Sequence, residues 1–104
     1  MNRLVDIRQW ASDRNLIEGG NPNAQFVKLI EEIGELAHGL AKGRPDEIED
    51  GVGDAVIVLT ILAAQCGFDI ENCIEVAWNE IKDRKGKMVN GIFIKEADLE
   101  QHPQ

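Results

Sequence analysis

Basic residues are scarce in this sequence. Its 104 residues include 11 Lys and Arg against 19 Asp and Glu, which gives a formal net charge of −8. Nucleic-acid phosphates repel a chain of this sign, so we expect no nucleic-acid partner. The carboxylates are still compatible with a nucleotide ligand, because a divalent cation can stand between them and the phosphates.

Cysteine and long apolar runs are also scarce. Cys66 and Cys73 lack the CxxC spacing of metal and redox motifs, so we expect them to be reduced thiols in the core of a cytoplasmic protein. No apolar run of the signal-peptide type opens the sequence. The longest apolar stretch, residues 55–64, has about half the length that spans a bilayer. The sequence predicts one soluble domain over residues 1–104, in the cytoplasm and with no membrane partner.

Turn residues and apolar periodicity predict an all-α fold with a four-helix core. The Asn90-Gly91 pair between short apolar runs predicts a β-hairpin, and the tail, residues 95–104, predicts a short helix or a loose end. The predicted helices cover residues 2–14, 22–42, 45–66 and 70–82. On the second helix, an apolar stripe predicts the side that faces the core: Phe26, Leu29, Ile30, Ile33, Ala37 and Leu40.

The third predicted helix is apolar on all sides from Val52 to Ala64. A helix without a polar face is buried on every side, and a domain this small has too few helices to surround it. We therefore expect a second copy of the chain to cover it, in a dimeric or tetrameric bundle formed by the helices. The β-branched residues of this segment leave a central β-strand as the alternative.

Two rows of carboxylates lie on the second and third predicted helices. Glu32 and Glu35 are neighbours at i, i+3, and Asp50 and Asp54 are neighbours at i, i+4. The short turn at residues 43–45 makes the two helices antiparallel, which places both pairs at similar heights above the turn. The four carboxylates are predicted to form an oxygen cage for Mg²⁺, with Mn²⁺ as an alternative ion.

Asp54 is the most informative of these acids, because it lies at the mouth of the apolar segment. An unpaired carboxylate is costly there, so a basic side chain or a metal ion must compensate it. Three glycines beside the acids each cost helix propensity, which predicts a close approach of helices or of a ligand at Gly34, Gly51 and Gly53.

Residues 28–36 (KLIEEIGEL) and 50–59 (DGVGDAVIVL) together resemble the signature of MazG-like nucleotide pyrophosphohydrolases, which belong to the all-α NTP pyrophosphatase superfamily. The family motif is EExxE followed by ExxD. Residues 79–87 are similar to the Asn/Lys/Arg segment of small members. The family's second motif would put Glu at position 51, where this sequence has Gly51. Asp50 is the candidate for the missing ligand, and the number of metal ions stays open.

The resemblance implies Mg²⁺-dependent cleavage of an NTP or dNTP between its α and β phosphates by a metal-activated water. The products are the monophosphate and pyrophosphate. Glu31 or Glu32 is the candidate for orienting or deprotonating the water. Base preference, sugar preference and physiological role are not specified by these motifs.

Residues outside the cage are candidates for holding the substrate. Lys28 is the first candidate for a phosphate, with an i, i+4 salt bridge to Glu32 as the alternative. Trp10 would stack on the base or else belong to the core, and Trp78 is assigned to the core. A basic cluster near residue 84 would bind phosphates or form a solvated helix end. The remaining candidates are Gln25, Asn79, Lys82, Arg84 and Lys85.

Two other functions remain open at this stage. Glu35 and His38 form an ExxH pair, as in di-iron carboxylate bundles, although the other histidine, His102, lies in the tail. Bound iron with an oxo-bridged absorption band would indicate this function. The second alternative is a non-catalytic acidic helical dimer that binds divalent cations or a protein partner. It would release no pyrophosphate from any nucleotide.

Overall fold

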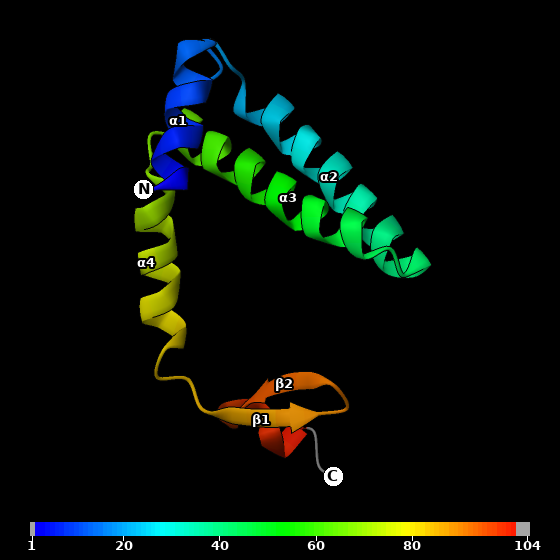
Figure 1. Cartoon of the computed structure of the whole chain (residues 1–104). Helices are drawn as coiled ribbons and strands as arrows, with labels where there is room; N and C mark the ends of the chain where they lie inside the picture. The colour runs from blue at the N-terminus through cyan, green and yellow to red at the C-terminus, as the bar shows by residue number, and fades with distance from the viewer. Residues whose placement is uncertain (1, 102–104) are drawn as a thin grey trace. The chain divides into compact units, whose positions relative to one another are not determined.

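The computed structural model describes residues 2–101 and contains two compact units, one up to Cys73 and one from Ile74 onward. The first unit holds three helices and the start of a fourth: α1 (Arg3–Asp13), α2 (Pro22–Lys42), α3 (Pro45–Gln65) and the first residues of α4 (Ile70–Ile81) (Figure 1). The second unit holds the rest of α4, the strands β1 (Gly86–Val89) and β2 (Ile92–Lys95), and the 3-10 helix η1 (Glu96–Gln101). All four predicted helices form, each boundary within one residue of its prediction.

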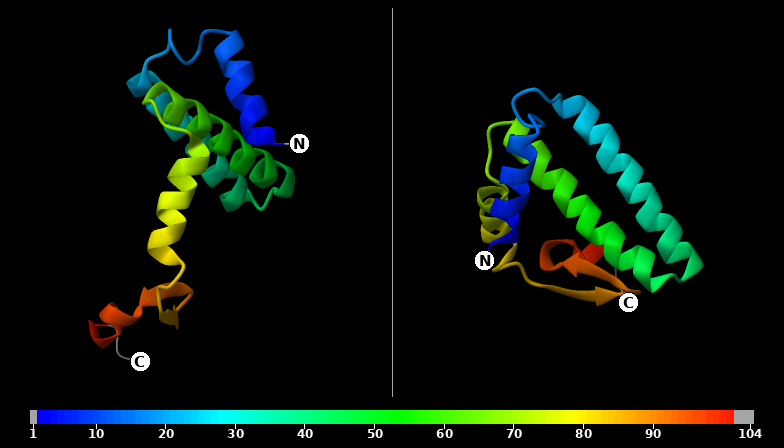
Figure 2. Two further views of the ribbon diagram at one scale, coloured as in Figure 1. Left: turned by 90° about the vertical axis from the view of Figure 1, so that its left-hand side faces the viewer. Right: turned by 45° about the horizontal axis from the view of Figure 1, so that its top comes forward.

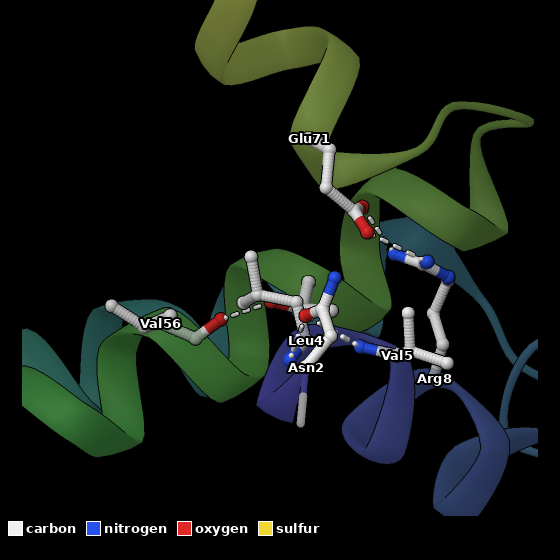
Figure 3. Close-up of polar contacts among 7 residues, drawn as sticks. Asn2, Leu4, Val5, Arg8, Val56 and Glu71 are labelled. Atoms are coloured by element: carbon white, nitrogen blue, oxygen red, sulfur yellow. Dashed lines mark hydrogen bonds and ion pairs between the residues drawn. The ribbon is translucent and has the colours of Figure 1, made fainter.

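Local signals start and stop the helices as the sequence predicts. Asn2 and Asn21 each accept hydrogen bonds from two backbone N–H groups in the first turn of α1 and α2. Figure 3 shows the cap at Asn2. Gly43 ends α2 with a φ of 62°, a left-handed conformation that glycine adopts readily.

The helices α2 and α3 lie side by side and antiparallel (Figure 2). The face of α2 that is buried here differs from the prediction. The predicted apolar stripe is largely exposed, with Ile30 53% exposed and Leu40 61% exposed. The positions that are partly or fully buried instead recur at spacings of three and four: Pro22, Gln25, Leu29, Glu32, Leu36 and Gly39. Glu32, one of the four predicted carboxylate ligands, therefore lies in the seam between α2 and α3.

Small residues explain this choice of face. A Cβ added to Gly39 would lie 3.0 Å from the Cβ of Glu47, and one added to Gly51 would lie 3.2 Å from the Cβ of Leu36. The backbones of α2 and α3 therefore approach most closely at these glycines. The predicted close approach of helices is confirmed at Gly51. It is wrong for the described helices at Gly34 and Gly53, where a Cβ meets nothing within 4 Å, and the approach of a ligand at those two positions stays a prediction.

The core of the first unit centres on α3, whose buried side chains are Ala55, Val58, Thr60 and Ile61. The Thr60 hydroxyl donates a hydrogen bond to the Val56 carbonyl at 2.7 Å, which satisfies the buried polar group. One chain alone does not bury α3 on every side as predicted, because Val52 is 51% exposed and Leu59 is 40% exposed. The alternative of a central strand is wrong, since the whole segment is helical.

The helix α1 packs against α3 through Ala11, which is fully buried. Gln65 at the end of α3 donates a hydrogen bond to the Leu16 carbonyl at 2.8 Å. Arg8 donates two hydrogen bonds to Glu71, at 2.5 and 2.9 Å (Figure 3). The guanidinium lowers the pKa of Glu71. These contacts fix α1 against the C-terminal half of α3 and the first turn of α4.

In the second unit the predicted hairpin is confirmed. β1 and β2 pair antiparallel, with Val89 opposite Ile92. Asn90 and Gly91 form the turn with positive φ angles of 51° and 80°, as a tight two-residue hairpin requires. Within the predicted tail, residues 96–101 form η1. Residues 102–104, which include His102, lie outside the residues that the structure describes.

Several side chains assigned to the core are exposed. Trp78 is 52% exposed, and its neighbours Ile74 and Ile81 on α4 are exposed as well. Cys66 and Cys73 are free thiols, as expected, but both are exposed rather than buried.

Among the described residues, no single helix has both the length and the apolar character needed to cross a bilayer. The consecutive helices α3 and α4 meet that criterion only when they are joined across the break between them.

Candidate functional site

Three of the four predicted metal ligands converge between α2 and α3. Glu32, Glu35 and Asp54 each offer one carboxylate oxygen, and these oxygens all lie within 4.8 Å of one another. The i, i+3 spacing brings the two glutamates together on α2, and the close seam at Gly51 brings Asp54 toward them. We call these three residues the carboxylate cluster.

Glu32 is a largely buried member of the carboxylate cluster. Its side chain is 12% exposed, and its Oε2 is buried without a hydrogen-bond partner among the described residues. Its Oε1 lies 3.7 Å from the Lys28 Nζ, so the salt bridge considered as the alternative role of Lys28 is present. A buried carboxylate oxygen without a partner destabilises the fold. The cluster therefore has the chemistry of a cation site.

The electrostatics of Asp54 lead to the same conclusion. Burial raises the pKa of Asp54, and the negative charges of Asp50 and then Glu32 raise it further. A carboxylate surrounded in this way lacks positive charge in its neighbourhood. A divalent cation would supply that charge, and carboxylate oxygens are the ligands that Mg²⁺ and Mn²⁺ prefer.

A pocket of about 320 Å³ opens beside the cluster, and we call it the acidic pocket. Its walls include two side chains outside the predicted Mg²⁺ and substrate sites, Glu47 and His38. Glu47 accepts a hydrogen bond from Arg44 at 2.9 Å and lies 3.3 Å from the Nδ1 of His38. Arg44, and then His38, lower the pKa of Glu47. The full lining is Glu35, His38, Glu47, Asp50, Gly51 and Asp54.

A sequence signal for Glu47 was present. Glu47 and Asp50 are spaced as ExxD, and both lie on the face of α3 that carries Asp54. Asp50 lines the acidic pocket and acts on Asp54, although it is not one of the three converging ligands. His38 had been considered only for a di-iron site, but the converging group of described ligands contains carboxylates alone.

The remaining candidates of the first unit lie in different environments. Glu31 is exposed on α2 and does not belong to the carboxylate cluster. Gln25 is half-buried in the seam. Trp10 is 48% exposed and therefore not a core residue. With Asp6, Ile7 and Ile57 it lines a second pocket of about 330 Å³ between α1 and α3, which we call the Trp10 pocket.

The other substrate-binding candidates belong to the second unit. Asn79 lies on α4, and the basic residues follow in the segment between α4 and β1. All four are exposed: Asn79, Lys82, Arg84 and Lys85. Their roles stay predictions.

Comparisons with known proteins agree with the sequence motifs. A family model described as the MazG nucleotide pyrophosphohydrolase domain matches residues 21–89, which include the whole carboxylate cluster. A relative from Haemophilus phage HP1 (strain HP1c1), named "Uncharacterized 18.2 kDa protein in rep-hol intergenic region", is 53% identical over 66 residues. That match covers 64% of this chain and 40% of the relative, so the chain corresponds to less than half of that protein's length. No solved structure matches the chain significantly.

Proposed function

Because the chain belongs to the MazG nucleotide pyrophosphohydrolase domain family through residues 21–89, we propose that it is a Mg²⁺-dependent nucleoside triphosphate pyrophosphohydrolase. In the proposed reaction, water attacks the α-phosphorus of an NTP or dNTP and the bond to the β-phosphate oxygen breaks. The products are the monophosphate and pyrophosphate. The convergence of Glu32, Glu35 and Asp54 on one point carries the proposal.

The carboxylate cluster, with Asp50 beside it, would hold Mg²⁺ or Mn²⁺. The buried, unpartnered Oε2 of Glu32 and the mutual repulsion around Asp54 support this assignment, since both are relieved by a cation. When bound, the ion offsets charge on the phosphate oxygens and lowers the pKa of a water molecule.

Residues of the chain supply the remaining tasks. Glu32 and Glu31 are the candidates for orienting the attacking water and taking up its proton. Lys28 is 58% exposed, so its Nζ can turn from Glu32 to a phosphate when a cation compensates the Glu32 carboxylate. Phosphate, sugar or base contacts are assigned to Gln25, Asn79, Lys82, Arg84, Lys85 and Trp10.

The exposed apolar side chains support self-association. Ile30 and Ile33 on α2, and Val52 and Leu59 on α3, are each at least 40% exposed. Apolar side chains exposed at helical spacing favour an interaction site, and we propose a second copy of the chain as its occupant, in a dimer or tetramer. A nucleotide substrate and free thiols favour a cytoplasmic location.

A panel of NTPs and dNTPs, assayed for pyrophosphate with and without Mg²⁺, tests the proposed activity. We expect Mg²⁺-dependent release by the wild type, and a loss of at least about a hundredfold in Glu35→Gln and Asp54→Asn with the helical circular dichroism retained. Glu49→Gln is the matched control, because Glu49 is exposed on α3 and lies outside the cluster.

Two outcomes would contradict the proposal. If either cluster variant kept most of the Mg²⁺-dependent rate, the site assignment would be wrong. If the wild type bound Mg²⁺ and released pyrophosphate from no nucleotide, the chain would be the non-catalytic cation-binding protein considered as the alternative.

A further inference from the structure

The Trp10 pocket lies next to the carboxylate cluster along α3. Asp50, Asp54 and Ile57 follow one another at i, i+4 and i+7, which places them on one face of the helix. Ile57 lies one turn beyond Asp54, about 4.5 Å further along the helix axis. In the opposite direction the same face carries Asp50 and Glu47, both acidic. Along this face of α3, a nucleotide held by its phosphates at the cluster therefore meets an apolar surface for its base toward the Trp10 pocket.

The indole of Trp10 packs against the guanidinium of Arg14. The guanidinium carbon of Arg14 lies 4.4 Å from the centre of the indole ring, and its Nη1 donates a hydrogen bond to the Trp10 carbonyl at 3.1 Å. A restrained aromatic ring beside Ile57 and Ile7 suits the stacking of a nucleobase, whose faces are apolar. Stacking alone does not distinguish one base from another.

Asp6 is the one charged residue that lines this apolar pocket. Its Oδ2 accepts a hydrogen bond from Arg3 at 2.8 Å, and its Oδ1 has no hydrogen-bond partner among the described residues. A carboxylate only accepts hydrogen bonds. It therefore attracts an amino group on the edge of a base and repels a carbonyl oxygen at the same position.

We propose that Asp6 is a specificity-determining residue that selects nucleotides whose base carries an exocyclic amino group, such as cytosine, over bases that present a carbonyl there, such as uracil. This inference rests on the proposed hydrolase function, because the carboxylate cluster positions the nucleotide. Asp6 takes no part in bond cleavage.

CTP and UTP are the sharpest pair of substrates, since they differ only at the 4-position and in the protonation of N3. The Asp6 side chain is 48% exposed, so we expect a preference of about tenfold in kcat/KM for CTP rather than the larger ratio of a buried site. In Asp6→Asn the side-chain amide can donate a hydrogen bond as well as accept one. The ratio of kcat/KM for CTP to kcat/KM for UTP should therefore fall to about one. Asp13→Asn removes the same charge from an exposed position on α1 and should keep the wild-type ratio.

A binding measurement separates this inference from the proposed function. In a Trp78→Phe variant Trp10 is the only tryptophan, and its fluorescence can be titrated with cytidine and uridine without Mg²⁺. We expect stronger quenching by cytidine, and equal quenching by the two nucleosides once Asp6→Asn is added. If this pattern appeared without turnover of any nucleotide, the hydrolase function would be wrong and the base site would stand.

Three results would overturn the inference. The first is equal kcat/KM for CTP and UTP in the wild type, which would leave the hydrolase function intact. The second is an unchanged ratio in Asp6→Asn. The third is Trp10 fluorescence that responds to protein concentration and to neither nucleoside, which would show that a second copy of the chain covers the pocket.

Discussion

Asp54 shows how a single residue is placed under opposite demands by folding and by cation binding. Its carboxylate lies in the seam of two helices, and the charges of Asp50 and Glu32 oppose its ionisation there. Without a cation, that charge destabilises the folded chain. With a cation bound, the same geometry supplies ligands that need no rearrangement.

The first prediction at the residue scale concerns Asp54→Asn without Mg²⁺. The pKa of Asp54 is raised in the folded state, so the folded chain retains this proton to higher pH than the unfolded chain does. Wild-type stability is therefore lost as the pH rises from the ordinary aspartate pKa through the raised value. Above that window we expect Asp54→Asn to be more stable than the wild type by roughly 0.5–2 kcal/mol.

Thermal unfolding followed by circular dichroism from acid to neutral pH measures this difference. The difference in stability between Asp54→Asn and the wild type should disappear toward acid pH. Added Mg²⁺ should raise the Tm of the wild type but not that of the variant. Glu49→Gln, which removes a charge outside the cluster, should leave the Mg²⁺ effect intact. A variant less stable than the wild type at neutral pH would show that the cluster is not repulsive.

At the scale of helices, the seam between α2 and α3 determines the site. The seam forms where small residues let the backbones approach, and it therefore includes Glu32 rather than the exposed stripe around Ile30. Packing thus buries a carboxylate and leaves large apolar side chains at the surface of the chain. That reversal is unfavourable for an isolated chain, but it places acidic oxygens where a cation can reach them.

The prediction at this scale compares two glycines of the same pair of helices. In Gly51→Ala the new methyl would lie 3.2 Å from the Cβ and Cδ1 of Leu36 on α2, so Leu36 must shift by a few tenths of an ångström. We expect a net loss of about 1 kcal/mol, because an overpacking cost of roughly 1–3 kcal/mol exceeds the gain in helix propensity of about 1 kcal/mol. Gly34→Ala meets nothing within 4 Å and should be stabilising by up to about 1 kcal/mol.

Urea unfolding of both variants measures these changes, and Mg²⁺ affinity should fall in Gly51→Ala alone. Equal effects of the two substitutions on stability would mean that the close approach at Gly51 does not control the seam.

At the scale of the whole molecule, the chain leaves much of its apolar surface uncovered. The exposed side chains on α2 and α3 follow helical spacing rather than a random scatter. A surface of this kind is typical of a chain that completes its core by association.

Light scattering after size exclusion tests this association. We expect a mass that is a multiple of 11.6 kDa, and a lower mass for Ile30→Glu, because a charge within the exposed stripe of α2 opposes its burial. Val5→Glu places the same charge on an exposed position of α1 and should keep the wild-type mass. A stable monomer of the wild type would contradict self-association.

The sequence by itself determined the local structure and the chemical character of the site. Asn21, Gly43 and the Asn90-Gly91 pair set the ends of α2 and the hairpin turn through local hydrogen bonds and backbone conformation. The spacing of the acids placed Glu32, Glu35 and Asp54 at one height, because helix geometry depends only on residue number.

Only the tertiary structure decided which faces meet. Helical periodicity identifies a stripe but not its neighbour, so it could not show that Leu36 packs on Gly51 while Ile30 stays exposed. It also could not bring His38 and Glu47 together at the acidic pocket, or place Trp10 beside Ile57 in a pocket rather than in the core. These outcomes depend on how closely two backbones approach, which is a property of all the side chains packed between them.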